Sequence, residues 1–243
     1  MIEVNGLTKR FGDITAVDGI SFAAADGEVT GLLGPNGAGK TTALRILYGL
    51  MLPDAGHVRV DGIDTATDPQ GAQRRMGVLT DSHGLYPRLT AREHIRYFGK
   101  LRGLGGADLE DRIDELVRQL NMGAIVDRRA EGFSHGERMK VSLGRALVHD
   151  PRTVILDEPT NGLDVQSTRA VRGLIRRMRA DSRCVLFSSH IMQEVSALCD
   201  RIVIVAGGRV VAEGTPDEIK QQTGLDNLED AFVALSGLDE VFA

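Results

Sequence analysis

One nine-residue segment constrains the fold of this chain more than any other feature. Residues 34–42 read Gly-Pro-Asn-Gly-Ala-Gly-Lys-Thr-Thr, which matches the pattern G-x-x-x-x-G-K-[ST]. The segment follows the apolar run 29–33 and precedes residues 40–50, whose apolar positions have helical spacing. A glycine-rich turn between a strand and a helix points several backbone N–H groups at one anionic ligand, and the helix dipole adds to the attraction. The context therefore predicts a site for the phosphates of a nucleoside triphosphate, rather than a turn that only caps a helix.

The residues of this segment are expected to surround the phosphates. Lys40 can place its ammonium on the β- and γ-phosphates, and the hydroxyl of Thr41 is a suitable ligand for Mg²⁺. The predicted contacts are Gly34, Pro35, Asn36, Gly37, Ala38, Gly39, Lys40, Thr41 and Thr42. The pattern alone leaves open whether the chain is a kinase, a GTPase, a motor or a transporter ATPase.

A second candidate feature is a pair of carboxylates at the end of an apolar run. Residues 154–156 are Val-Ile-Leu, and Asp157 and Glu158 follow them directly. A strand buried on both faces should not end in two negative charges unless a cation or a proton balances them. We expect Asp157 to hold Mg²⁺ through its water shell, and Glu158 to act as the general base for the attacking water. An incidental acidic pair on a solvated strand end is the alternative.

A histidine follows another predicted strand. His190 comes after the predicted strand 184–188, which ends in Ser188, and after Ser189. The ends of neighbouring parallel strands face one crevice, so His190 is expected to bond the γ-phosphate and to orient the attacking water. From the residues alone, a purely structural histidine stays open.

Composition limits the class of protein. The chain has 243 residues, of which 42% are hydrophobic and 26% are charged, and these values are ordinary for a globular protein with a sizeable core. The formal net charge of −5 lacks the positive excess of a dedicated nucleic-acid binder, so we expect no nucleic-acid partner. Two cysteines are too few for a disulfide framework. No stretch approaches the roughly 20 apolar residues of a membrane span, and the N-terminus does not have the pattern of a signal peptide.

The pattern along the chain indicates strands toward both ends and helices in the middle. Near the N-terminus, short strands at 2–7 and 20–24 come before and after a turn at residues 18–19, and Asp26-Gly27 is a hairpin signal. From residue 153 onward, strands alternate with helices, which predicts a parallel sheet covered by helices. Helical spacing dominates residues 81–150, which we expect to form an insertion into that sheet. A helical tail is expected over residues 216–243.

Together these motifs resemble those of the ATP-binding subunit of an ABC transporter. Residues 133–137, Phe-Ser-His-Gly-Glu, stand where that family has its signature loop, usually Leu-Ser-Gly-Gly-Gln. Residues 161–164, Asn-Gly-Leu-Asp, resemble its D-loop, which makes Asp164 a nucleotide-binding candidate, and His190 matches its switch histidine. Phe11 stands where an aromatic side chain usually stacks on adenine. The resemblance covers about residues 2–215. It implies the ABC ATPase fold, an α/β P-loop NTPase sheet with N-terminal antiparallel β strands and a helical insertion, with residues 1–243 forming one domain.

The resemblance also implies a nucleotide site shared between two copies of the subunit. Each ATP would lie between residues 34–42 of one copy, the phosphate loop, and the residues Ser134 and Gly136 of the other. The residues themselves are compatible with this, because they open a predicted helix whose N-terminal N–H groups and serine hydroxyl suit a γ-phosphate. A plain capping box formed by Ser134 and Glu137 fits the same residues. We expect identical chains to pair, and pairing with a different subunit is the alternative.

Two positions depart from the usual pattern of the family. Asp81 aligns with the Q-loop glutamine, and although it is shorter and charged, we expect it to contact Mg²⁺ at the nucleotide site. His135 and Glu137 replace the commoner glycine and glutamine of the signature loop. These features and the segment 82–93 resemble the sodium-extrusion (Nat-type) subgroup, whose ATPases pair with a separate export permease.

The function that the resemblance implies is ATP hydrolysis coupled to export, of sodium ions or drugs, through an integral membrane permease. The subunit would use ATP and Mg²⁺, and it would be cytoplasmic, held on the cytoplasmic face of the cell membrane by the permease. The alternative is a soluble ABC ATPase that acts in cofactor or complex assembly. A metabolite kinase would leave residues 133–137 and 161–164 unexplained.

Overall fold

The computed structural model of the chain describes residues 1–80 and 84–237, and it divides the strands between two sheets. The larger sheet has the order β10-β9-β3-β8-β7-β6, and all neighbouring pairs in it are parallel except β9 with β10. Its strands are β3 (Val29–Leu33), β6 (Met76–Leu79), β7 (Thr153–Asp157), β8 (Cys184–Ser188), β9 (Arg201–Ala206) and β10 (Arg209–Gly214). Every residue of β3, β7 and β8 is buried, because both faces of this sheet are covered. The predicted parallel sheet is confirmed.

The smaller sheet is antiparallel and has the order β2-β1-β4-β5. Its strands are β1 (Ile2–Phe11), β2 (Ile14–Ala24), β4 (Ala55–Val60) and β5 (Ile63–Asp64). The hairpin expected at Asp26-Gly27 is wrong, because β2 and β3 belong to different sheets. The actual hairpin turns at Gly12, which has a positive φ of 58°.

The turn expected at residues 18–19 is also wrong, because β2 runs through them. Leu7 pairs with Ile20 and Lys9 pairs with Val17, so β2 carries one extra residue there, which forms a bulge. The backbone N–H of Asp18 donates to the carbonyl of Gly208 at 2.8 Å. The local Asp-Gly signal therefore marks a bulge that ties β2 to the loop between β9 and β10.

Helices cover the sheets, and α1 (Lys40–Leu47) lies between them. Leu44, Ile46 and Leu47 belong to one hydrophobic cluster with residues of both sheets. The other helices of this part are α2 (Pro69–Arg75), α6 (Val165–Ala180), α7 (Met192–Leu198), α8 (Pro216–Thr223) and α9 (Leu228–Ser236). The position of α1 fixes the loop before it at the carboxyl end of β3.

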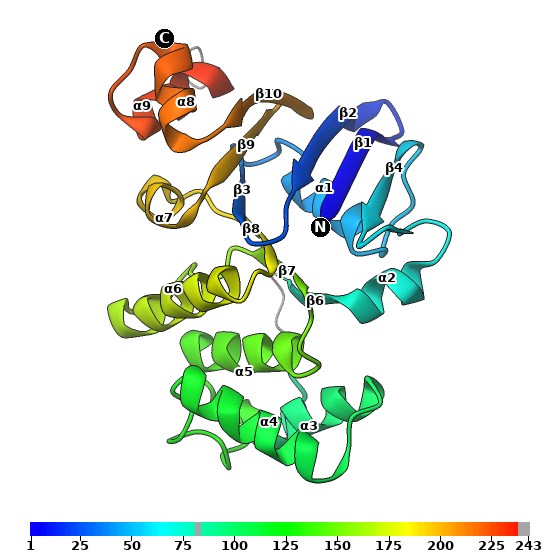
Figure 1. Cartoon of the computed structure of the whole chain (residues 1–243), viewed down its shortest axis with the longest axis vertical. Helices are drawn as coiled ribbons and strands as arrows, with labels where there is room; N and C mark the ends of the chain where they lie inside the picture. The colour runs from blue at the N-terminus through cyan, green and yellow to red at the C-terminus, as the bar shows by residue number, and fades with distance from the viewer. Residues whose placement is uncertain (81–83, 238–243) are drawn as a thin grey trace.

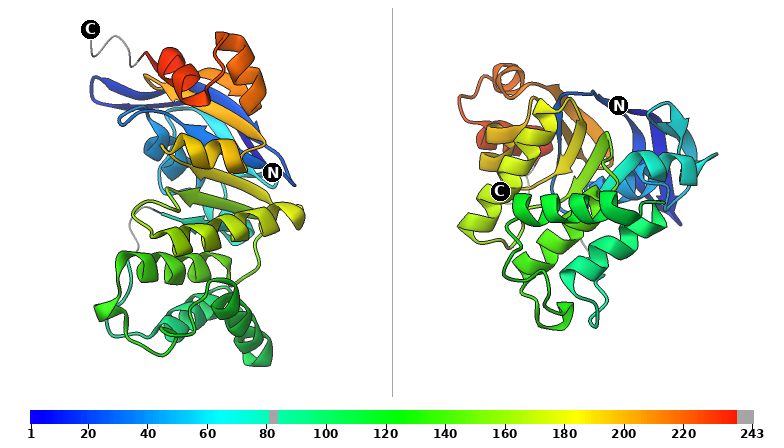
Figure 2. Two further views of the ribbon diagram at one scale, coloured as in Figure 1. Left: turned by 90° about the vertical axis from the view of Figure 1, so that its left-hand side faces the viewer. Right: turned by 60° about the horizontal axis from the view of Figure 1, so that its bottom comes forward.

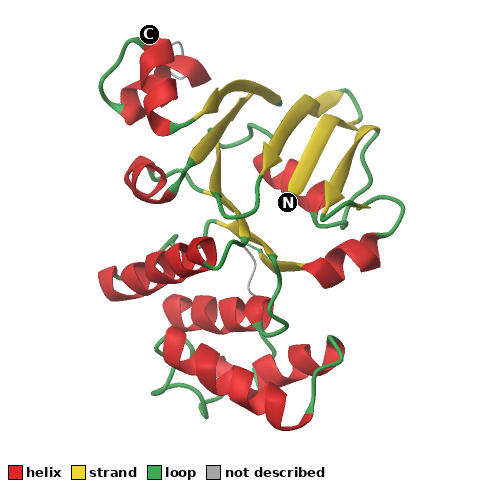
Figure 3. Cartoon of the chain, in the orientation of Figure 1, coloured by secondary structure: helices red, strands yellow, loops and turns green. Residues whose placement is uncertain are grey.

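A group of helices separates the neighbouring strands β6 and β7 in sequence. It contains α3 (Ala91–Leu101), α4 (Gly106–Gln119), a 3₁₀ turn (Ala130–Gly132) and α5 (His135–Leu147). These helices form the lower end of the molecule, while both sheets lie in the upper part (Figures 1 and 3). Figure 2 shows the same separation after rotation, with α8 and α9 at the opposite end. The assignment of the whole chain to one domain, with an insertion over 81–150 and a tail over 216–243, stays a prediction.

Within residues 1–80 and 84–237, none of the helices combines the length and the apolar character needed to span a bilayer.

Candidate active site

Three of the predicted motifs lie at the ends of three neighbouring strands. In the parallel sheet, β8 lies between β3 and β7. The phosphate loop follows β3, His190 comes shortly after β8, and β7 ends in Asp157 with Glu158 next to it. Because the strands are parallel, these residues gather at one edge of the sheet, which is where α/β proteins bind ligands.

Two glycines of the phosphate loop allow close approaches that no other residue would permit. A Cβ atom on Gly34 would lie 2.2 Å from the carbonyl oxygen of Val205, and one on Gly39 would lie 2.3 Å from that of Ala16. Gly39 also has a positive φ of 101° directly before α1. Residues 36–42 and Ala16 line a small open cavity of about 170 Å³. The loop is therefore seated tightly against β9 and β2, with its opening at the start of α1.

Lys40 turns its ammonium into the loop. Its Nζ donates to the carbonyl oxygen of Gly34 at 2.6 Å and to that of Pro35 at 3.1 Å. Burial lowers the pKa of Lys40, while the negative charges of Glu158 and Asp157 oppose that shift. A half-buried cation held by loop carbonyls is well placed to meet an anion that binds the loop.

Ser188, the last residue of β8, connects the two acidic residues. Its hydroxyl donates to Oδ1 of Asp157 at 2.6 Å and accepts from the backbone N–H of Glu158 at 3.0 Å. Ser188 is fully buried and Asp157 is 6% exposed. Ser188 is not among the predicted site residues, because the signal for it is its register opposite Asp157, which only the paired strands reveal.

Glu158 and His190 contact each other directly. Nδ1 of His190 donates to Oε2 of Glu158 at 2.9 Å, and the Glu158 side chain is 19% exposed against 57% for His190. Glu158 has a positive φ of 48°, an uncommon backbone conformation for a residue with a side chain. The strained turn directs this carboxylate toward the histidine from the neighbouring strand.

A second buried network was not predicted from the sequence. Glu194 on α7 is 2% exposed, and it accepts a short hydrogen bond from the hydroxyl of Thr160. Arg172 on α6 donates to the other oxygen of Glu194 at 3.3 Å. These contacts hold the turn after Glu158 against two helices. The available signal was the four-residue spacing of Glu194 from Leu198, which places a carboxylate on the buried face of α7.

The signature-loop residues lie elsewhere in the molecule. Ser134 caps α5, where it forms a capping box with Glu137, so the plain capping interpretation is confirmed. A Cβ on Gly136 would lie 3.5 Å from the Leu163 side chain. In Figure 1, α5 lies below the sheets, whereas α1 lies among them. One chain therefore does not bring the start of α5 to its own phosphate loop.

Asp164 caps α6 within the same chain. Its carboxylate accepts from the backbone N–H of Ser167 at 2.8 Å and from the Ser167 hydroxyl at 2.9 Å. These hydrogen bonds, with that from the backbone N–H as the larger cause, lower the pKa of Asp164. Its geometry is that of a helix cap next to the segment that resembles the D-loop.

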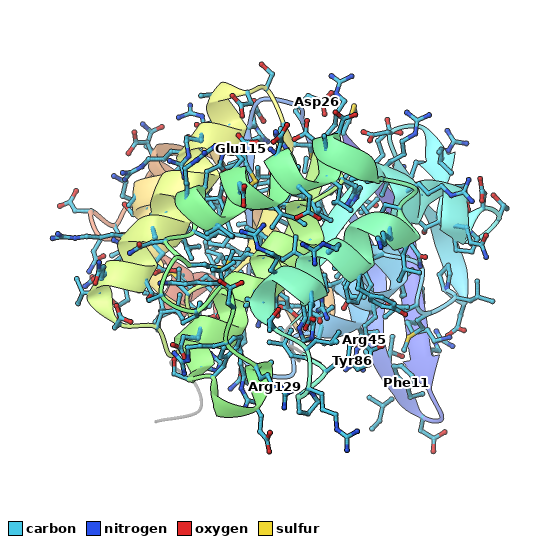
Figure 4. The ribbon with its side chains drawn as sticks, turned by 90° about the horizontal axis from the view of Figure 1, so that it is seen from below. Phe11, Asp26, Arg45, Tyr86, Glu115 and Arg129 are labelled. Atoms are coloured by element: carbon cyan, nitrogen blue, oxygen red, sulfur yellow. The ribbon has the colours of Figure 1, made fainter. Side chains whose placement is uncertain are left out.

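Phe11 lies at the tip of the hairpin between β1 and β2. It is 47% exposed, and Figure 4 shows it at the outer edge of the molecule. Nζ of Lys9 lies 5.8 Å from the centre of the Phe11 ring. An exposed ring of this kind is available for stacking. Asp81, the predicted Mg²⁺ contact after β6, lies outside the described residues.

Comparisons with known proteins place the chain in one family. A sequence model of the ABC transporter family matches residues 17–161. The ABC transporter ATP-binding protein NatA of Bacillus subtilis (strain 168) is 40% identical over 239 residues, which cover 96% of this chain and 97% of that protein. The Nod factor export ATP-binding protein I of Ralstonia nicotianae is 36% identical, over 94% of this chain and 72% of that protein.

Solved structures give the same result. An ATP-binding subunit of an ABC transporter matches with a TM-score of 0.91 and 32% identity, over 97% of this chain and 99% of that one. The dimeric post-hydrolysis state of the ATP-binding cassette MJ0796, bound to ADP and Pi, matches with a TM-score of 0.80 and 25% identity, over 88% of this chain and 98% of that one. The phosphate loop and the acidic strand end both fall inside the matched residues, so the site and the fold lead to the same conclusion. The chain belongs to the ABC transporter family, as a subunit that binds and hydrolyses ATP.

Proposed function

We propose that two copies of this chain enclose two ATP molecules and that their opening and closing drives export through a separate membrane permease. Each ATP would bind the phosphate loop of one copy and the start of α5, with Ser134 and Gly136, in the other. One observation carries this proposal: the loop, Asp157 and the Glu158–His190 pair share one sheet edge, whereas the start of α5 belongs to another part of the chain. A second copy supplies the missing half.

The residues at the sheet edge fit a Mg²⁺ ion. Mg²⁺ prefers oxygen ligands and is usually bound in proteins by one or two side chains together with phosphates and water. The hydroxyl of Thr41 at the start of α1 and the buried carboxylate of Asp157 provide such oxygens. We propose these two residues as its protein contacts, with Asp81 as a third. When bound, the ion would neutralise charge on the β- and γ-phosphates.

The remaining residues have distinct roles in hydrolysis. Lys40 would exchange its loop carbonyls for phosphate oxygens, and the backbone N–H groups of residues 36–41 would bind the same phosphates. Glu158 would take a proton from the attacking water, because its carboxylate projects at the strand end. His190 would orient that carboxylate through the 2.9 Å hydrogen bond and would contact the γ-phosphate. Phe11 would stack on the adenine, and Asp164 would lie near the shared site.

Export is the direction that the relatives support. One relative is named a Nod factor export ATP-binding protein, and NatA matches nearly the whole chain. We propose that this subunit works on the cytoplasmic face of the cell membrane, bound to an integral permease. Sodium ions and drugs are the cargo classes that the resemblance to the Nat-type subgroup implies.

The test is to tag the full chain in its native cell, extract the membranes in mild detergent, and identify the proteins that co-purify. A polytopic membrane protein in stoichiometric yield is the expected result, and it would identify the permease. Recovery only with soluble partners, with the chain absent from membranes, would contradict the export function and favour an ATPase that acts in the assembly of a cofactor or complex.

A further inference from the structure

His135 lies in the signature segment, but the proposed function gives its side chain no role. It follows the cap residue Ser134 at the start of α5, where the usual signature loop of the family has a glycine. A glycine has no side chain that could reach another segment. An imidazole at this position is therefore an addition to the loop, and its contacts show what the addition does.

The imidazole spans from α5 to the segment that follows the turn carrying Glu158. Nε2 of His135 donates to the carbonyl oxygen of Asn161 at 2.9 Å. Gly162 makes room for the ring, because a Cβ there would lie 3.2 Å from Cδ2 of His135, and its φ of +68° also favours glycine. The next residue of α5, Gly136, packs beside Leu163. The start of α5 and residues 161–163 therefore form one packed unit.

The same segment is hydrogen-bonded to the backbone of Glu158, the residue that carries the proposed catalytic carboxylate. The backbone N–H of Asn161 donates to the carbonyl oxygen of Glu158 at 3.2 Å. Thr160, inside this turn, is anchored to the buried Glu194. The carboxylate of Glu158 then accepts from His190 at 2.9 Å. A displacement of the start of α5 can thus move Glu158, because the short turn between Glu158 and Asn161 connects them. Glu194 holds this turn from its other side through Thr160.

We propose that His135 is a positioning residue that couples the two ATP sites of the dimer, by tying the start of α5 to the turn that carries Glu158. This inference rests on the proposed shared site. In that dimer, the start of α5 contacts the ATP of the partner chain, whereas Glu158 acts on the ATP of its own chain. His135 therefore links the closing of one site to the placement of the catalytic base in the other.

The experiment compares His135→Leu with His135→Gln in the full chain. Leucine keeps a similar volume without a donor, whereas the amide nitrogen of glutamine can replace Nε2 as the donor to Asn161. We expect kcat for ATP hydrolysis to fall about five- to tenfold in His135→Leu, as the loss of one hydrogen bond implies. KM for ATP should stay within about twofold, and His135→Gln should keep kcat within about twofold of the parent. Both thermal midpoints should match the parent because the side chain is exposed.

Two results would overturn the coupling role. The first is that kcat does not depend on the hydrogen bond. This would be seen either as an unchanged kcat in His135→Leu or as an equal loss of kcat in both variants. The second is a raised KM with unchanged kcat, which would mean that the ring contacts the nucleotide of the partner instead.

A parallel measurement keeps this inference separate from the proposed function. In a Glu158→Gln background, ATP-dependent dimers are measured with and without His135→Leu. If the Glu158→Gln variant without His135→Leu fails to dimerise, the shared site itself is contradicted. If both proteins dimerise, with and without His135→Leu, and kcat falls as described above, the coupling role is supported. If both dimerise and His135→Leu does not lower kcat, only the role of His135 is contradicted.

Discussion

Ser188 and Lys40 show how single residues bring the separate strands of the site together. Ser188 uses one hydroxyl to bind the carboxylate of Asp157 and the backbone N–H of Glu158, so β8 holds the acidic side chain that ends β7 and the backbone of the residue after it. Lys40 faces the same carboxylates from the loop after β3, and their charges act on its pKa. The site is thus held by contacts between neighbouring strands. Ser188 and Asp157 are the last residues of β8 and β7, and Lys40 is the first residue of α1, the helix after β3.

Replacing Lys40 with alanine should remove most of the nucleotide affinity. The substitution deletes the ammonium that donates to two loop carbonyls, and charge-assisted contacts contribute about 2–3 kcal/mol, or about 30- to 150-fold in affinity. Titration with a fluorescent ATP analogue measures the change. Binding as tight as that of the parent would show that residues 34–42 do not form the phosphate site.

The sequence predicts some site residues and misses others for a physical reason. Lys40, Asp157 and Glu158 belong to local patterns next to a strand, so their placement needs only a correct strand assignment. Glu194 acts through Thr160 and Arg172, which are 34 and 22 residues away along the chain. No local pattern encodes which of these distant side chains meet, because the packing of α6 and α7 decides it.

At the level of helices and strands, close contacts between α5 and the sheet position the signature segment. Gly77 in β6 lies against α5 and the loop that follows it, because a Cβ there would lie 2.4 Å from the carbonyl oxygen of Ala146 and 2.7 Å from the Pro151 ring. Ser134 caps the other end of the same helix. The cap therefore fixes where α5 begins, and the close contact with Gly77 fixes the position of its end against β6.

Gly77→Ala should destabilise the protein, whereas Gly173→Ala should stabilise it. The added methyl group on Gly77 forces the end of α5 away from β6, and overpacking of this kind costs about 1–3 kcal/mol. Gly173 is the matched control, since it lies inside α6 with open space around its Cβ position, and alanine there should add about 0.5–1 kcal/mol. Urea denaturation measures both. A Gly77→Ala protein as stable as the parent would mean that α5 does not approach β6 this closely.

The strands also show where local patterns fail. The segment 184–188 is a strand with the expected bounds, because a short apolar run between breakers indicates a buried strand. Asp26-Gly27 has the composition of a hairpin turn, yet it connects two different sheets. A turn signal reports the local backbone, but the sheet that a strand joins depends on distant partners. Short helices such as α2 lack enough apolar positions to show a period, and no helix was predicted there.

At the scale of the whole molecule, the phosphate loop lies among the sheets and the start of α5 lies in the helical end (Figure 1). His149, just past the end of α5, links the two parts, because its Nε2 donates to the carbonyl oxygen of Met76 in β6 at 3.1 Å. Burial, with the nearby positive charge of Arg102, lowers the pKa of His149 from 6.5 to about 4. This junction is therefore formed with a neutral histidine.

Mild acid should weaken the fold through His149. Between pH 6.5 and pH 4 the unfolded chain binds a proton at this residue that the folded chain does not, so the free energy of unfolding falls as the pH drops. The loss from pH 7 to pH 5 is at most about 2 kcal/mol. Urea denaturation at both pH values, with His149→Leu as the comparison, measures it. The variant should lose much of the pH dependence, and an unchanged dependence would show that His149 is not the responsible group.

The most direct test of the shared site is the association state of Glu158→Gln in saturating Mg-ATP, measured by size-exclusion chromatography with light scattering. Glutamine keeps the shape of the side chain but cannot accept the proton, so ATP should bind and remain uncleaved. We predict a dimer of this variant that forms only with Mg-ATP, and a monomer of the Lys40→Ala, Glu158→Gln double variant under the same conditions. A Glu158→Gln protein that binds ATP and stays monomeric would contradict the account.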